Sequence, residues 1–310
     1  MRLGVLDVGS NTVHLLVVDA HRGGHPTPTH SEKTVLRLAE HVNAVGTLSK
    51  VGAHALVAAV HAARDAAQEL GCDDLLAFAT SAVRDARNST AVLDRVRTET
   101  GVDLQVLAGM DEARLTFLAV RRWFGWSAGR LVVMDIGGGS LELATGMDET
   151  PDVAGSLPLG AGRLTREHFG EDPPDRVAVE RLRSLVGEQL ATLAPGLLAA
   201  GTPDRAVATS KTLRTLARLT GAAPSKEGPR VPRHLTLAGL RQLIAFISRM
   251  AAADLAQLDG VSPARAHQLL AGAVVAEATM QSLALSSVEV CPWALREGVI
   301  LRRLDWLDGV

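Results

Sequence analysis

The chain has 310 residues, of which 47% are hydrophobic, and its formal net charge at pH 7 is −2. This length and apolar content favour two domains with sizeable cores over a single domain. The sequence contains no basic tail and no run of Lys and Arg, so it does not indicate a nucleic-acid-binding protein. A balanced total charge leaves a polyanionic substrate open, because it says nothing about local charge.

Neither end of the chain predicts export or membrane insertion. The first residues, MRLGVLDVGSN, lack the long apolar stretch of a signal peptide. The most apolar late segment, 267–285, contains Glu277 and is too short and too polar to span a bilayer. Cys72 and Cys291 lie far apart among apolar residues, which predicts buried free thiols in a reducing compartment. We therefore expect a cytoplasmic protein with no membrane partner.

An internal repeat is the main feature of the chain. Residues 3–19 read LGVLDVGSNTVHLLVVD and residues 131–145 read LVVMDIGGGSLELAT. Each is an apolar run, an Asp, a short Gly-containing turn and a second apolar run, which predicts a β-hairpin whose first strand ends at the Asp. A second pair, FATSAVR at 78–84 and VATSKTLR at 207–214, predicts a strand followed by a helix with Thr-Ser at its start. The shared order indicates two related α/β halves facing each other across a cleft.

Helical periodicity and stop signals place the elements of the first half. We expect a helix over 51–70 that stops at Gly71, a helix over 89–100, a short strand over 102–107 and a helix over 110–123. The glycines of the segment 125–129 suggest a linker. The predicted domains are therefore 1–125 and 126–310, with the last helix allowed to pack back toward the first domain.

The second half is predicted to contain more helix. A helix should follow Pro173 and Pro174 and run to about 193, and Thr236 should cap a helix over 237–250. Ser262-Pro263 should open a helix to about 285, and Pro292 should occupy the first position of a final helix after a strand at 288–291. Residues 222–233, rich in Pro, Gly and charge, are predicted to form a loop.

The turn of the first hairpin has the composition of an anion-binding loop. A Gly turn after a buried strand lets backbone N–H groups approach an anion without an obstructing Cβ. Ser10, Asn11 and Thr12 add side-chain donors, and Asp7 could hold Mg²⁺ directly or through water.

The second hairpin repeats this composition. Gly137, Gly138 and Gly139 precede Ser140, while Asp135 and Glu142 supply two carboxylates. One such loop alone is most often only a turn, but two matching loops in a duplicated chain favour phosphate binding.

Other candidates are weaker from spacing alone. Arg84, on the first turn of a predicted helix, could clamp phosphate oxygens or form a surface salt bridge with Asp85 or Asp111. Lys211 holds the matching position in the second half. Glu112 could serve as a general base, but acidic residues are ordinary at a helix start.

Several motifs, in order along nearly the whole chain, resemble one known family. They are LDVGSNTVHLLV, FATSAVRDARNS, GMDEARLTF, VMDIGGGSLEL, SLPLGAGRLT and CPWALREGVIL. The chain resembles the exopolyphosphatase and guanosine pentaphosphate phosphohydrolase family of the actin-like superfamily. The resemblance implies two ribonuclease-H-like domains, each a mixed sheet flanked by helices, with a cleft between them.

The resemblance also implies roles for individual residues. Glu112 matches the base that activates water, Arg84 an arginine that contacts the scissile phosphate, and Asn88 a structural support of the helix of Arg84. The metal-binding carboxylates match Asp135 and Glu142, with Mg²⁺ as the cofactor. The phosphate-binding positions match Ser10, Asn11 and 137–140, and His14 lies where the family carries His or Arg, although a strand histidine with protein partners is the alternative.

Two departures from the family bear on the substrate. Many members have Ser-Gly-Thr where this chain has Thr209-Ser210-Lys211-Thr212, and a lysine there would crowd a nucleoside while favouring a further phosphate. The sequence also lacks the helical C-terminal domains with which longer members hold long polymers. Both points favour short chains of inorganic polyphosphate as the substrate.

Three alternatives stay open at this stage. The first is hydrolysis of the 5′-terminal phosphate of guanosine pentaphosphate by the same motifs. The second is a kinase or ATPase of the actin-like superfamily, although no clear double-glycine adenosine motif lies near 207–214. The third is a non-catalytic phosphate or alarmone sensor.

The resemblance further implies a homodimer.

Overall fold

The chain folds into two compact units. The computed structural model describes residues 1–21, 24–43 and 45–306. One unit consists of Met1–Glu112 with Arg296–Val310, and the other of Ala113–Leu295. The division falls within α4 (Gly109–Phe124), whereas the predicted boundary lies beyond the end of this helix. The difference has a physical reason, because Phe117 and Val120 of α4 are fully buried in a cluster with Leu131 and Val133 of the second unit.

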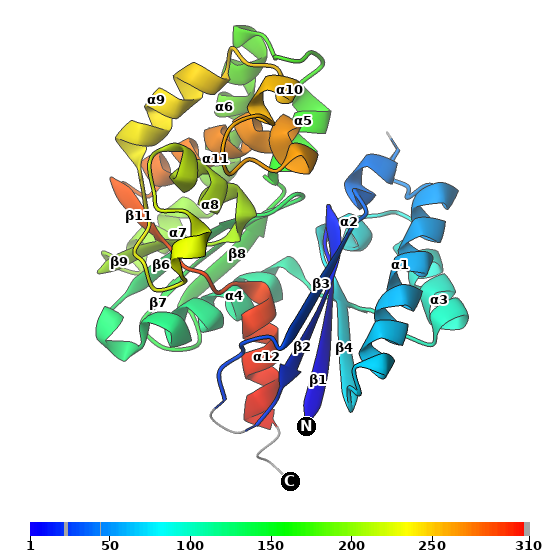
Figure 1. Cartoon of the computed structure of the whole chain (residues 1–310). Helices are drawn as coiled ribbons and strands as arrows, with labels where there is room; N and C mark the ends of the chain where they lie inside the picture. Colours follow the sequence, from blue (N-terminus) through cyan, green and yellow to red (C-terminus); the bar gives the residue numbers. More distant parts are fainter. Residues whose placement is uncertain (22–23, 44, 307–310) are drawn as a thin grey trace. The chain divides into compact units, whose positions relative to one another are not determined.

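The first unit is built on a five-stranded mixed sheet with the order β3-β2-β1-β4-β5. The central hairpin pairs β1 antiparallel with β2, and β1 pairs parallel with β4 on its other side (Figure 1). The strands are β1 (Arg2–Val8), β2 (Thr12–Asp19), β3 (His30–Val35), β4 (Asp74–Ala79) and β5 (Gln105–Val106).

The second unit repeats this plan in a six-stranded sheet with the order β10-β11-β9-β6-β7-β8. Its central hairpin, β6 with β7, is again antiparallel, and β6 pairs parallel with β9. Both sheets are flanked by helices, so the predicted α/β class with two duplicated halves, each a mixed sheet with helices around it, is confirmed. The strands are β6 (Leu131–Ile136), β7 (Leu141–Gly146), β8 (Val153–Leu157), β9 (Arg205–Ala208), β10 (His234–Thr236) and β11 (Ser287–Val290).

The helices of the first unit begin and end close to the predicted positions. The Ser49 hydroxyl caps α1 by accepting from the Gly52 amide at 3.1 Å, and α3 ends at Gly101, whose φ of 72° is left-handed. Apolar side chains of α1 pack on the sheet in one core. The helices are α1 (Lys50–Glu69), α2 (Ser81–Arg84), α3 (Ser89–Thr100) and α12 (Leu295–Trp306), with a 3₁₀ turn over Leu38–His41.

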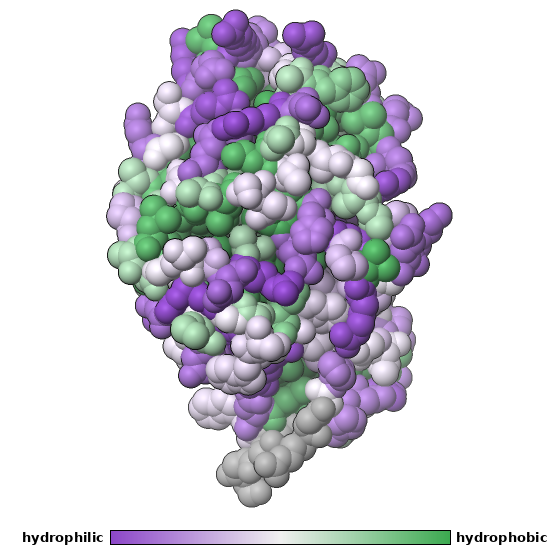
Figure 2. All heavy atoms as spheres, turned by 90° about the vertical axis from the view of Figure 1, so that its left-hand side faces the viewer, coloured by the Kyte–Doolittle hydropathy of each residue, from purple (hydrophilic) through white to green (hydrophobic). Residues whose placement is uncertain are grey.

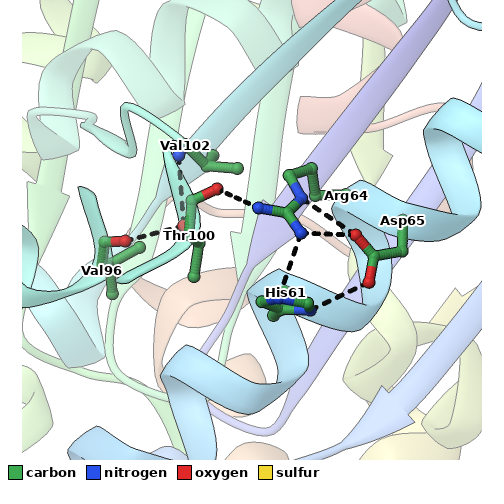
Figure 3. A network of polar contacts seen from close by, with 6 residues as sticks. All are labelled: His61, Arg64, Asp65, Val96, Thr100 and Val102. Atoms are coloured by element: carbon green, nitrogen blue, oxygen red, sulfur yellow. Dashed lines mark hydrogen bonds and ion pairs between the residues drawn. The ribbon is translucent and has the colours of Figure 1, made fainter. Parts of the chain in front are cut away.

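A polar network ties α1 to the end of α3 (Figure 3). Arg64 donates to the Thr100 carbonyl at 2.7 Å and to the Asp65 carboxylate at 2.6 Å. The Thr100 hydroxyl in turn donates to the Val96 carbonyl at 2.7 Å. The hydrogen bond from Arg64 lowers the pKa of Asp65. The hydrogen bond from Arg64 therefore satisfies the Thr100 carbonyl, one of the last carbonyls of α3, which have no helical partners.

In the second unit, helices gather around α11 (Leu269–Ser282), which is buried along most of its length. Both α6 (Arg176–Leu190) and α9 (Leu237–Ile247) pack on it. A helix that is apolar on all sides belongs in the interior of a domain, and α11 has that composition. The remaining helices are α5 (Ala161–His168), α7 (Ala194–Ala199), α8 (Ser210–Leu219), α10 (Ala252–Leu255) and 3₁₀ turns at Trp126–Ala128, Ser225–Glu227 and Pro263–Gln268.

Several predicted elements have different bounds. The strand expected over 102–107 is only β5, and the helix expected from Pro263 winds as 3₁₀ helix before α11 begins, a common arrangement at helix starts. Pro292 does not open α12, because the segment after β11 stays irregular while Trp293 packs edge-on against Trp123, with 5.3 Å between ring centroids. Cys291 is buried as predicted, whereas Cys72 is only half-buried.

The edge strands β3 and β8 were not predicted. Five of the six residues of β3 are exposed and its sequence, HSEKTV, lacks an apolar alternation. Exposed charged residues are typical of an edge strand, which must avoid pairing with other chains. The sequence pattern of these residues therefore does not predict a strand.

Exposed apolar residues are scattered over the surface. Figure 2 shows hydrophobic residues on one face in patches among hydrophilic ones, as is ordinary for a folded domain. No helix within the described ranges is both long and apolar enough to cross a membrane.

Arg121 of α4 is a buried cation held by backbone carbonyls. It is 1% exposed and donates to the carbonyls of Gly125, Gly129 and Gly146 at 3.3, 2.7 and 3.0 Å. Burial lowers the pKa of its guanidinium, and the negative charge of Asp148 opposes this shift. The side chain thus fastens the end of α4 to the end of β7.

We expect Arg121→Met to lower the free energy of unfolding by about 2–4 kcal/mol, because buried carbonyls lose their donors. Thermal and urea unfolding followed by circular dichroism would measure the loss. The matched control is Arg122→Met, which removes an ion pair with Glu149 at 2.7 Å on the surface and should cost less than about 1 kcal/mol. Equal losses in the two variants would contradict a special role for Arg121.

Candidate active site

The loop of the first hairpin is fixed by its own backbone and by the following segment. The Gly9 amide donates to the Thr12 carbonyl at 3.0 Å, which closes the turn. The Ser10 carbonyl accepts from Ala39, and the Asn11 carbonyl accepts from Leu36 and Arg37, each at 3.0 Å. Ser10 and Asn11 are each 6% exposed. The loop is therefore held in one conformation before any ligand binds.

A buried hydroxyl pair connects this loop with α2. The Ser10 and Ser81 hydroxyls lie 3.1 Å apart, and the Thr80 amide donates to the Val8 carbonyl at 3.1 Å. The predicted donor Ser10 thus also positions the start of α2, and Thr80 occupies the N-cap as expected. Asn88 supports the neighbouring segment by bonding the Leu48 amide and carbonyl at 2.9 and 3.0 Å.

The two predicted catalytic residues of the first unit form an ion pair in which Glu112 is buried and Arg84 is half-buried. Arg84 donates through Nη1 to Oε1 of Glu112, which is 5% exposed, and to the Leu107 carbonyl at 3.2 Å. Its Nε donates to Asp85 at 3.0 Å, so the predicted salt bridge with Asp85 is also present. Burial opposes the charge of Arg84, but the carboxylates of Glu112 and Asp85 outweigh burial and raise the pKa of the guanidinium. Arg84 in turn favours the ionised form of Glu112.

Asp7 and His14 face each other across β1 and β2, and Arg296 of α12 joins them. Arg296 Nε lies 3.9 Å from Asp7 Oδ2, and its Nη1 donates to His14 Nδ1. Because arginine cannot accept a hydrogen bond, His14 Nδ1 is the acceptor and Nε2 carries the proton, which it donates to Ser31 at 2.8 Å. This arrangement agrees with the alternative of a strand histidine with protein partners. Arg296 was missed as a site residue, although it lies in the motif CPWALREGVIL.

The loop of the second hairpin has the same turn. The Gly137 amide donates to the Ser140 carbonyl at 2.9 Å, as Gly9 does to Thr12. The Thr209 amide at the start of α8 donates to the Met134 carbonyl at 2.9 Å, whereas the Thr80 amide at the start of α2 donates to Val8, an acceptor two residues further along the hairpin. The predicted duplication thus extends to the backbone hydrogen bond of the turns, while the strand before α8 is shifted against its hairpin.

Asp135 and Glu142 belong to a row of polar side chains that crosses the second sheet. They are register partners on β6 and β7. The Thr209 hydroxyl donates to Asp135, and the Ser156 hydroxyl donates to Glu142 at 2.8 Å. Directly opposed residues have Cβ atoms about 5 Å apart, so two like charges are held close together.

The energetics of this row favour a bound cation. The pKa of Asp135 is raised, because burial outweighs the hydrogen bond from Thr209 and the charges of Arg214 and Arg265, which act to lower it. Within the described residues, no group of three or more His, Cys, Asp and Glu forms a complete metal cage. Two neighbouring carboxylates without further protein ligands suit Mg²⁺, which usually takes one or two carboxylates together with waters and substrate phosphates.

The start of α8 carries the departure from the family motif. Ser210 has a φ of 73°, a left-handed conformation that glycine adopts without strain and serine does not. Lys211 is exposed and lines a small cavity of about 20 Å³ with Arg265 and Gln268. Arg265 was also missed, because nothing in the sequence distinguishes it from an ordinary helix-start arginine.

The start of α5 holds the triple-glycine loop in place. The Ala161 amide donates to the Gly137 carbonyl at 3.0 Å, and the Arg163 amide donates to the Gly138 carbonyl at 2.9 Å. A Cβ on Gly160 would lie 2.2 Å from the Gly139 carbonyl carbon, so the two backbones are in direct contact. Gly160 is thus a positioning residue that sequence reasoning missed, although it lies in the motif SLPLGAGRLT.

We expect Gly160→Ala to displace the loop 137–140, because its Cβ would also lie 2.3 Å from the Ser140 amide nitrogen. The variant should lower the melting temperature and weaken binding of inorganic phosphate by about tenfold or more, measured by calorimetry. Gly187→Ala in α6 is the control, since a Cβ there meets nothing within 4 Å. Unchanged phosphate binding in Gly160→Ala would show that the backbone contact of Gly160 does not set the loop.

Comparison with known proteins gives one consistent result. The model of the Ppx/GppA phosphatase family matches residues 17–306. Exopolyphosphatase 1 of Mycobacterium bovis is 65% identical over 305 residues, covering 98% of this chain and 89% of the relative. Exopolyphosphatase 1 of Mycobacterium leprae is 63% identical over 305 residues, covering 98% of this chain and 90% of the relative.

Solved structures show the same fold. A Ppx/GppA enzyme of Aquifex aeolicus is 26% identical, with a TM-score of 0.79, over 97% of this chain and 99% of that one. An exopolyphosphatase from Cytophaga hutchinsonii has a TM-score of 0.88 at 24% identity, over 99% and 98% of the two chains. The second similarity shows the fold alone.

Proposed function

Since this chain belongs to the Ppx/GppA phosphatase family, we propose that it is an exopolyphosphatase, a phosphoanhydride hydrolase that removes the terminal phosphate of inorganic polyphosphate. The name of its relatives at 65% and 63% identity supports this substrate. The observation that carries the chemistry is the ion pair of buried Glu112 with half-buried Arg84, which combines a carboxylate with a guanidinium suited to phosphate oxygens.

Glu112 is the proposed general base. A carboxylate that is kept ionised can orient water and accept its proton as the water attacks phosphorus. Arg84 would bind an oxygen of the phosphate under attack, and its bonds to Leu107 and Asp85 would hold the guanidinium in place during the reaction. Phosphoryl transfer needs positioning and charge neutralisation more than covalent help from the protein, so these two roles are sufficient for the first unit.

The loops supply the remaining ligands in this proposal. The preformed turns at Ser10–Thr12 and at Gly137–Ser140 would donate hydrogen bonds to the phosphates. Asp135 and Glu142 would hold Mg²⁺, which when bound neutralises phosphate charge. Asp7 and His14 would support the first loop together with Arg296, and Lys211 with Arg265 would meet a phosphate further along the chain.

We expect Glu112→Ala to reduce phosphate release from polyphosphate by about 10²–10⁴-fold, the usual contribution of a general base. Release would be measured with Mg²⁺ from short polyphosphate, long polyphosphate, guanosine pentaphosphate and ATP. Asp111→Ala is the control, because it removes an acid from the same first turn of α4 and should change the rate only slightly.

The substrate panel also discriminates among the alternatives. Faster release from guanosine pentaphosphate would make the alarmone the substrate, and equally fast release from ATP would indicate an actin-like ATPase. Tight binding without any release would indicate a sensor. Preference for long over short polyphosphate would overturn the proposed short-chain substrate.

We expect Asp135→Asn to raise the Mg²⁺ concentration needed for half-maximal activity by about tenfold or more, because one of two opposed carboxylates loses its charge. The dependence of activity on Mg²⁺ concentration would be measured for this variant and for the control Glu289→Gln, which removes an acid of β11 that pairs with Arg205 of β9. An unchanged Mg²⁺ requirement in Asp135→Asn would contradict the assignment of the cation to this row.

Two further proposals come from family resemblance. The chain would act in the cytoplasm, and it would form a homodimer. Sedimentation velocity would test the second, and a monomer at micromolar concentration would overturn it.

A further inference from the structure

A groove on the second unit lies outside the residues assigned to catalysis. It encloses about 540 Å³, a volume in the range of small-molecule sites, and runs between α6 and α9. Both helices pack on α11, which forms its floor. Its lining includes four arginines, which are Arg176 and Arg183 of α6, Arg241 of α9 and Arg249, which follows α9.

The inner pair of arginines shares a single buried carboxylate. Glu277 of α11 is 6% exposed and accepts from Arg183 at 2.8 Å and from Arg241 at 3.2 Å. Gln281 donates to the same carboxylate at 3.1 Å. Arg183 also pairs with Glu180 at 2.8 Å on the exposed rim. The inner pair is therefore fixed in direction, and its two positive charges face the two carboxylates of Glu277 and Glu180.

The outer pair consists of Arg176 and Arg249. Asp172 lies four residues before Arg176, and Ala252 lies three residues after Arg249. The Asp172 carboxylate accepts from the Ala252 amide at 3.0 Å, so the two arginines lie at the same end of the groove. Arg176 lies seven residues before Arg183, which places it about 10 Å away along the helix. Among the residues that the structure describes, neither Arg176 nor Arg249 has a side-chain ion pair or hydrogen bond.

Two acids near this end lie outside the lining of the groove, where they keep their negative charge. Asp172 is directed to the Ala252 amide, and Asp175 accepts from the Ala178 amide at 2.6 Å as the cap of α6. The complete lining holds four arginines against Glu180 and Glu277, which leaves an excess of positive charge. Between the two pairs lie the apolar side chains of Val179 and Ile244, 7% and 6% exposed.

We propose that this groove is a second binding site for an oligophosphate, separate from the residues assigned to hydrolysis. Guanidinium groups bind phosphate oxygens in pairs, and two arginine pairs about 10 Å apart suit a chain of linked phosphates better than a single anion. Inorganic polyphosphate and nucleoside polyphosphates share this chemistry.

The test uses calorimetric titration of the Glu112→Ala protein, in which the ligand should not be consumed. Tripolyphosphate, guanosine triphosphate and orthophosphate are titrated into this protein and into the same protein carrying Arg176→Ala and Arg249→Ala. We expect the double substitution to remove one class of tripolyphosphate or nucleotide sites, or to weaken that class about tenfold or more. Tighter binding of tripolyphosphate or of the nucleotide identifies the source of the ligand.

Two further variants make the result specific. Arg181→Ala removes an exposed arginine of α6 that does not line this groove, and it should leave every isotherm unchanged. Arg176→Lys with Arg249→Lys keeps the charge but not the paired donors, and it should bind more weakly than the parent protein. It also keeps the test possible if the alanine variant does not fold.

The proposal is overturned if the Arg176 and Arg249 variants bind tripolyphosphate and the nucleotide with the same affinity and stoichiometry as Arg181→Ala. It is also overturned if orthophosphate binds this class of sites as tightly as the oligophosphates. Loss of hydrolysis would not affect this result, because binding in the groove is read separately from turnover.

Discussion

In each sheet, a glycine amide at the end of the first central strand donates across a tight turn to a carbonyl, from Gly9 to Thr12 and from Gly137 to Ser140. This hydrogen bond sets the path of the loop on which the proposed phosphate-binding groups lie. The carboxylates depend on it too, because Asp135 and Glu142 are opposed only while β6 and β7 keep their register.

Both loops are held by backbone amides that donate to their carbonyls, from residues 36–39 in the first loop and from Ala161 and Arg163 in the second. The additional supports differ, since the first loop has the hydroxyl contact of Ser10 with Ser81 and the second has the direct backbone contact of Gly139 with Gly160. The second loop also adjoins a row with two carboxylates, while the first adjoins Asp7 and the cation of Arg296. The duplicated halves therefore offer different electrostatic environments on the same backbone plan.

The hairpins, the main helices and the residues of both loops could be predicted, because strand alternation, helix caps and glycine turns are local signals. The edge strand β3 could not, since its exposed polar residues lack a periodic pattern. Arg296 and Arg265 were missed for another reason, because they reach the site residues from segments far away in the sequence. The role of Gly160 depends on a backbone contact that no spacing encodes.

The first unit is discontinuous, since α12 completes it after the whole second unit has been made. Arg303 of α12 pairs with Asp74 of β4 at 2.9 Å, and Ile300 and Leu304 are buried. During synthesis, the sheet of β1 to β5 therefore lacks α12 until residues 113–295 have been made and this helix has left the ribosome. At about 5–20 residues per second, that delay lasts on the order of 10–40 seconds. A chaperone that shields exposed apolar surface would have its opportunity in this interval.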